Sequence, residues 1–129
     1  MPRQATVAHA TNKAAVLTKA VVNTADYLGI TKTKLAHVIG VSPATVSRLY
    51  GHGSGYQLNP SSKEWDFAVL LVRMFRSLDS IVGGSTEDAK KWMHSRNKAF
   101  ADRKPVEVIE STEGLVRVVT YLDAYRAVI

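Results

Sequence analysis

Residues 35–49 read LAHVIGVSPATVSRL, and this stretch decides how the chain is expected to fold. Gly40 divides it into two apolar-periodic segments, and glycine readily takes the positive φ of a tight turn. Ser42 is a good helix N-cap, and Pro43 suits the first helical position. The shared interior is expected from the apolar residues Leu35, Ile39, Val41, Val46 and Leu49. The stretch therefore predicts two helices, over 31–40 and 43–50, joined as a helix-turn-helix.

The outward side of the second helix is expected to be small and polar, so that the helix can enter a DNA major groove. Arg48 is long enough to reach a guanine edge or a phosphate, and a basic run precedes the turn. The predicted DNA-contacting residues are Lys32, Lys34, Ser42, Ala44, Thr45, Ser47 and Arg48. An ordinary helical hairpin without a nucleic-acid role is the alternative, because glycine turns and small-residue crossings occur in many bundles.

The distribution of charge agrees with a polyanionic partner for the first half of the chain. The net charge is +6 over 129 residues. Residues 1–60 carry six Lys or Arg and a single acid, Asp26, whereas residues 61–129 carry eleven bases and ten acids. Neutralising phosphates releases counterions and favours binding, so the basic half is the expected DNA-binding half.

The residues of enzyme and metal chemistry do not form recognisable motifs. The absence of cysteine excludes disulfides, cysteine-ligated zinc and thiol nucleophiles. The four histidines are scattered, and the glycine-rich run 51–55 lacks the Gly-Lys-Ser/Thr ending of a phosphate loop. We expect no enzyme activity, no cofactor and no metal. We also expect no export signal and no membrane span, and hence a cytoplasmic protein.

Apolar spacing of three and four residues predicts an all-α chain. Besides the two helices above, helices are expected at 11–28, 61–82, 86–95 and 112–129, with a single turn at 105–109. The first ten residues are expected to fray, and Ser61 with Glu64 and Thr112 are the expected caps of the two long later helices. The helix over 61–82 is apolar on two faces and should be central. We predict a DNA-binding domain over 1–60 and a second helical domain over 61–129, either as one body or as two coupled lobes.

The second half resembles the C-terminal domain of the Xre/MbcA/ParS antitoxins. The motifs that carry the resemblance are Trp92, Asn97-Lys98-Ala99-Phe100, Pro105-Val106-Glu107-Val108-Ile109 and Thr112-Glu113-Gly114. The resemblance covers about residues 62–129, and an N-terminal Xre-type helix-turn-helix fits the same architecture. It implies an antitoxin that binds a RES-type, NAD-degrading toxin, represses the shared operon through operator DNA, and forms a homodimer.

Tyr and Arg are enriched in binding hot spots, which points to the last helix as a partner surface. The predicted toxin-binding residues are Arg96, Asn97, Lys98, Tyr121, Tyr125, Arg126 and Ile129. Two alternatives stay open: Tyr125 and Ile129 simply complete the core stripe of this helix, and the basic loop is merely solvated. Trp65, Trp92 and Phe100 are expected in the core. At the level of function, the alternatives are a stand-alone repressor and an adaptor that does not bind DNA.

Overall fold

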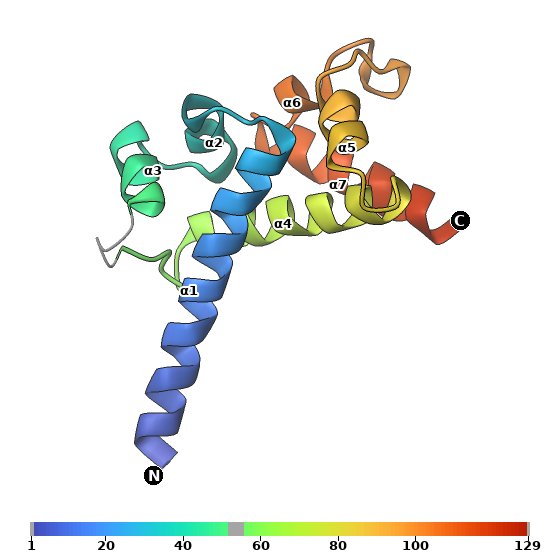
Figure 1. Ribbon diagram of the computed structural model, residues 1–129. Coiled ribbons are helices and arrows are strands. Elements are labelled where there is room, and N and C mark those ends of the chain that lie inside the picture. The colour runs from blue at the N-terminus through green and yellow to red at the C-terminus, as the bar shows by residue number, and fades with distance from the viewer. Residues whose placement is uncertain (1, 52–55, 129) are drawn as a thin grey trace.

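The computed structural model describes residues 2–51 and 56–128, with side chains from Lys13 onward. Over these residues the chain is helical, as predicted, and it contains no regular strand (Figure 1). The elements are α1 (Pro2–Leu28), α2 (Lys32–Ile39), α3 (Pro43–Tyr50), α4 (Lys63–Ile81), α5 (Thr86–Met93), the 3₁₀ turn η1 (Lys98–Phe100), α6 (Pro105–Val108) and α7 (Thr112–Val128). No helix in the described part of the chain is both long and apolar enough to cross a membrane.

The helix-turn-helix forms as the sequence predicts. The Thr31 side chain caps α2 by accepting the Lys34 N–H, and Ser42 caps α3 by accepting the Thr45 N–H at 3.1 Å. Gly40 ends α2 in the left-handed region, with φ 75° and ψ 39°. The predicted interior is buried except Val41, which is partly buried. The helix ends of this unit are therefore fixed by the residues that cap them.

Helix α4 is the central helix of the molecule, also as predicted. It packs against α7 on one side and against α1 and α2 on the other. Both of its apolar faces are used, because Leu71, Met74 and Leu78 are all fully buried. In Figure 1 the N-terminal half of α1 extends well beyond this packed body, whereas its C-terminal half crosses α4.

The start of α1 differs from the prediction. The helix begins at Pro2, so the expected fraying of the first ten residues is wrong at the level of the backbone. Proline is well suited to the first turn of a helix, and residues 3–28 contain no glycine and no further proline to interrupt it. Residues 52–55 of the glycine-rich run lie outside the described residues.

Two predicted caps are each displaced by one residue. Ser62, not Ser61, caps α4 by accepting the Trp65 N–H at 3.3 Å. Asn59 organises this turn: its side chain accepts the Ser61 N–H at 2.9 Å, and its carbonyl oxygen accepts both the N–H and the hydroxyl of Ser62. At α7 the cap is Ser111 and not Thr112, since the Ser111 hydroxyl accepts the Gly114 N–H at 3.0 Å.

Gly114 allows α6 to pack closely against α7. An ideal Cβ at this position would lie 1.8 Å from the carbonyl oxygen of Val108. The short helix α6 therefore rests directly on the first turn of α7. This approach is the physical reason for glycine in the Thr112-Glu113-Gly114 motif.

Candidate DNA-binding and partner-binding surfaces

The predicted DNA-contacting side of α3 is on the surface. Ser42, Ala44, Ser47 and Arg48 are exposed, and Thr45 is partly buried. The Ser42 and Thr45 hydroxyls lie 3.0 Å apart, so both help to hold the first turn of α3. The opposite side of α3 is anchored by Val46 and Leu49, both buried. A short, small-residue helix face is thus held rigidly outward, as entry into a major groove requires.

The two predicted lysines, Lys32 and Lys34, have different neighbours. The Lys32 ammonium lies 4.8 Å from the ring centroid of Tyr50, at the end of α3. Burial, followed by the charge of Asp26, raises the pKa of the Tyr50 hydroxyl, so this ring stays neutral beside the lysine. The Lys34 ammonium instead lies 3.6 Å from the Glu110 carboxylate, before α7. Lys32 therefore accompanies α3, whereas the charge of Lys34 is partly neutralised.

The two halves of the chain are joined at this second lysine. His37 Nδ1 lies 2.8 Å from the other oxygen of Glu110. The hydrogen bond with His37 is the main reason that the pKa of Glu110 is lowered, and Lys34 adds to the effect. A second histidine, His94, forms a hydrogen bond of 2.9 Å between its Nε2 and the carbonyl oxygen of Leu28 at the end of α1. Helices α1 and α2 are thus tied to elements of the C-terminal half.

Two of the predicted toxin-binding residues form part of an exposed aromatic surface. Tyr121 and Tyr125 lie one turn apart on α7, with ring centroids 6.3 Å apart. Tyr121 also contacts the rings of Trp92, at 6.4 Å, and Phe100, at 5.2 Å. Tyr125 is 51% exposed, which answers the open alternative: it does not complete the core stripe.

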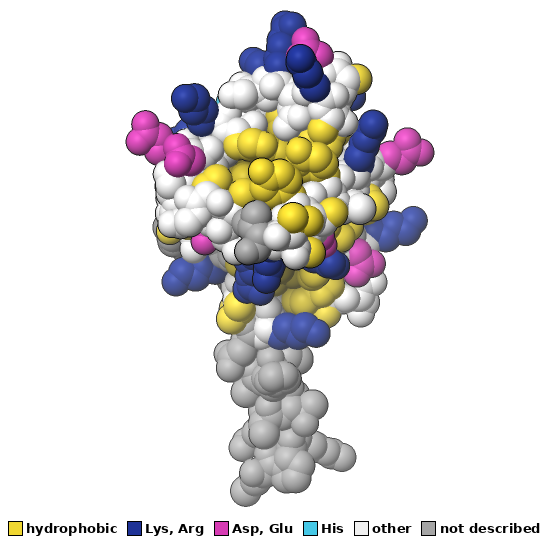
Figure 2. All heavy atoms as spheres, turned by 90° about the vertical axis from the view of Figure 1, so that its right-hand side faces the viewer, with side chains coloured by type: hydrophobic (Ala, Val, Ile, Leu, Met, Phe, Trp, Pro, Cys, Tyr) yellow, Lys and Arg dark blue, Asp and Glu magenta, His cyan; other side chains and the backbone are white. Residues whose placement is uncertain are grey.

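A small hollow of about 180 Å³ lies beside these rings. Its rim joins the end of α4 to α5 and α7, and its floor is formed by Leu78 and Leu122. We call this surface the aromatic patch and define it by Ile81, Val82, Trp92, Tyr121 and Tyr125. Figure 2 faces this end of the molecule and shows hydrophobic side chains gathered there, with charged side chains around them. An exposed apolar area with a charged border is typical of a protein-binding site.

The predicted basic loop is organised by its own contacts. The Asn97 side chain accepts the Ala99 N–H at 2.9 Å, and the Asn97 backbone pairs with Arg103. Arg96 lies 3.7 Å from Asp102, and Lys98 is exposed. Asn97 therefore has a structural task, which is to shape the turn that leads to Phe100. The toxin contacts predicted for these three residues stay predictions.

Arg126 does not lie with the tyrosines. It points to the other side of α7, where its Nη1 lies 3.4 Å from the Ser77 hydroxyl on α4. Ile129 lies outside the described residues. Trp92, which was expected in the core, is only partly buried and belongs to the aromatic patch. The sequence signal for this surface was the i, i+4 spacing of Tyr121 and Tyr125. Which surface these two tyrosines form depends on how α7 packs with α5.

Comparison with known families gives the class of the protein. The family model described as the antitoxin Xre-like helix-turn-helix domain matches residues 7–73. The model described as the antitoxin Xre/MbcA/ParS C-terminal toxin-binding domain matches residues 77–127. The chain therefore belongs to the Xre-like antitoxin family, which confirms the resemblance seen in the sequence. The two matches meet within α4, and the division of the chain at residue 60 stays a prediction.

A solved structure supports the same fold. A chain of the crystal structure of the M. tuberculosis MbcT–MbcA toxin–antitoxin complex superimposes with a TM-score of 0.62 at 24% sequence identity. The match covers 88% of this chain and 96% of that chain. At this identity the likeness shows a shared fold. No curated protein matches the sequence.

Proposed function

We propose that this protein neutralises a cognate toxin by direct binding through the aromatic patch, and that it represses its own operon through α3. The observation that carries the first part is the exposed cluster of Trp92, Tyr121 and Tyr125 on the module that matches a toxin-binding domain. Aromatic side chains dominate binding hot spots, and these three surround an apolar hollow that a partner side chain can fill.

The DNA-binding part rests on the outward face of α3. Its exposed residues are small apart from Arg48, and Lys32 adds a positive charge nearby. The operator is expected to contain inverted half-sites about one helical turn apart, ~34 Å, or a multiple of it, because a homodimer presents two α3 helices. Binding to operator DNA also places the protein in the cytoplasm.

The proposed toxin is of the RES type and degrades NAD. This part of the proposal comes from the resemblance of the Asn97–Phe100, Pro105–Ile109 and Thr112–Gly114 motifs to the antitoxins of such toxins. The solved relative supports the wider class, since it belongs to a toxin–antitoxin complex.

Co-expression with the neighbouring reading frame tests the proposal. The neighbour alone should stop growth and lower cellular NAD, and this chain should restore both and co-purify with it. Growth arrest with unchanged NAD would overturn the RES assignment alone. A neighbour that neither arrests growth nor co-purifies would overturn the antitoxin function, and a salt-dependent footprint on the upstream DNA would then leave a stand-alone repressor.

A further inference from the structure

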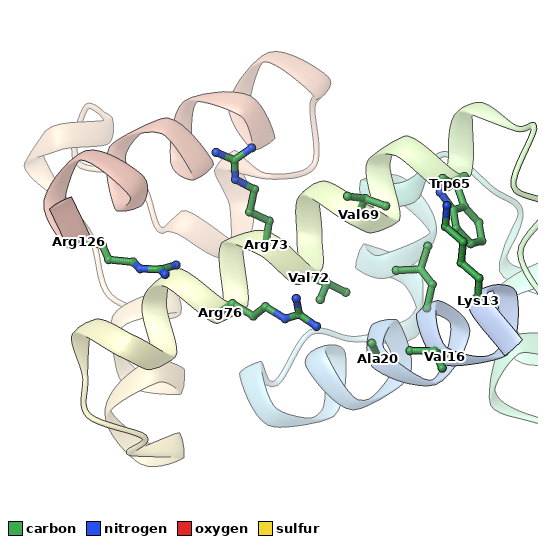
Figure 3. Close-up of a pocket in the computed structure, with 10 residues that line it drawn as sticks. Lys13, Val16, Ala20, Trp65, Val69, Val72, Arg73, Arg76 and Arg126 are labelled. Carbon is green, nitrogen blue, oxygen red and sulfur yellow. The ribbon is translucent and has the colours of Figure 1, made fainter. Parts of the chain in front are cut away.

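A large apolar groove runs between α1 and α4, away from both surfaces described above. Its volume is about 980 Å³. The apolar residues that line it are Val16, Leu17, Ala20, Val69 and Val72, together with the side of Trp65. Val16 is 66% exposed and Val69 is 43% exposed, so two branched aliphatic side chains face water across this groove. Figure 3 shows Val16 and Ala20 on α1 opposite Val69 and Val72 on α4.

Most of the positive charges at the edge of the groove already have neighbours within the chain. Arg73 Nη2 lies 2.6 Å from the Asp123 carboxylate, and Arg126 contacts the Ser77 hydroxyl. The Lys13 ammonium lies 5.7 Å from the ring centroid of Trp65. Three of the four lining cations are therefore engaged, and the apolar floor is the part that lacks a cover. This favours an apolar occupant over an acidic peptide or a nucleic acid.

We propose that a second copy of this chain covers the groove, with α1 of each copy lying in the groove of the other. The inference deepens the homodimer of the proposed function by assigning its interface. Helix α1 supplies one wall of the groove, and its N-terminal half extends beyond the body where a partner can reach it (Figure 1). A surface that contains both a projecting helix and an open groove is self-complementary, as a two-fold interface requires.

The composition and length of α1 suit this role. Residues 2–19 contain no acid and no glycine and are rich in alanine, valine and threonine. A helix of 27 residues is about 40 Å long, so two α1 helices that cross can bury the ~1,000 Å² or more of a specific interface. Arg73 and Arg126 remain at the edge of such an interface, paired as they are in the single chain.

Sedimentation of the full chain tests the assignment. The wild type should sediment at twice its 14.1 kDa mass. Val16→Asp and Val69→Asp should each raise the dimer dissociation constant at least tenfold, because a charge would be buried against the partner. Val116→Asp on α7 is the matched control, since Val116 is a valine of similar exposure, 45%, away from the groove. Circular dichroism of each variant checks that the fold is kept.

Chemical cross-linking gives a second readout that does not depend on a charged variant. The chain has no cysteine, so Val16→Cys introduces a single reactive site. A short bismaleimide linker should join two Val16→Cys copies, and it should leave Val116→Cys chains single.

Two results would overturn the inference: a monomeric wild type, or a dimer that both groove variants preserve. If these dimeric variants lose toxin binding, the groove is assigned to the toxin instead. A monomer that still neutralises the neighbour's toxin would overturn the interface and keep the antitoxin function. If the wild type forms a dimer that Val69→Asp breaks, but binds no toxin, the interface is kept and the antitoxin function is overturned.

Discussion

His37 Nδ1 lies 2.8 Å from Oε1 of Glu110, and this contact joins α2 of the helix-turn-helix to the turn before α7. Lys34, one helical turn before His37 on the same face of α2, reaches the second oxygen of the same carboxylate at 3.6 Å. One acid of the module that matches the toxin-binding domain thus holds two basic side chains of the helix-turn-helix module. The contact also accounts for the lowered pKa of Glu110, with the His37 hydrogen bond as the main cause.

Glu110→Gln should make stability less dependent on pH in the acidic range. A carboxyl whose folded-state pKa is lowered contributes stability above its unfolded pKa of about 4.3, and this contribution is lost as the pH falls through the folded-state pKa. The variant should therefore be less stable than wild type at pH 6, by less than ~1 kcal/mol for a partly exposed pair, and this difference should shrink as the pH falls to 3. Urea unfolding at the two pH values measures this.

The matched control for that experiment is Glu107→Gln, which removes the same charge from an exposed position on α6. Its difference from wild type should stay nearly constant between the two pH values. An equal response of the two variants would show that the contact with His37 and Lys34 contributes nothing to stability.

Gly114→Ala should strongly destabilise the protein. The added Cβ would lie 1.8 Å from the Val108 carbonyl oxygen, so the backbone of α6 or α7 must move. Overpacking of this kind costs about 1–3 kcal/mol, whereas an exposed substitution such as Arg117→Ala on the same helix should stay within about 0.5 kcal/mol. Thermal unfolding compares them, and equal midpoints would mean that the close approach of α6 to α7 is not as described.

Lys32→Ala and Lys34→Ala should affect DNA binding differently. Lys32 lies beside the end of α3, so its loss should reduce the slope of log K against log salt by about 1. Lys34 is paired with Glu110, so its loss should change the slope by clearly less. Fluorescence anisotropy with the upstream DNA at several salt concentrations measures both slopes, with Lys90→Ala on α5 as control. Equal changes for Lys32 and Lys34 would rule out this distinction.

The sequence was most informative where a structure is decided locally. Thr31, Gly40 and Ser42 each fix one end of a helix through their own side chain or φ, so the helix-turn-helix could be predicted with its boundaries. The cap of α4 could not, because Ser61 and Ser62 are equivalent by composition and the Asn59 turn chooses between them.

The proposed partner-binding surface depends on tertiary packing, which the periodicity of the sequence does not show. Tyr125 and Arg126 are neighbours in sequence, yet they point about 100° apart around α7 and reach different surfaces. Trp92 joins Tyr121 only because α5 packs beside α7 in the folded chain. The sequence therefore indicated the residue types of a binding surface but not which of them lie together.

We propose that one chain carries two separate surfaces, α3 for operator DNA and the aromatic patch for the toxin. The most direct test measures operator affinity and growth rescue for Arg48→Ala and Tyr125→Asp side by side. Arg48→Ala should weaken operator binding by about 1–3 kcal/mol and still rescue growth, whereas Tyr125→Asp should bind the operator as wild type does and fail to rescue. If Arg48→Ala abolishes rescue, or if Tyr125→Asp rescues fully, the division of function between the two surfaces is contradicted.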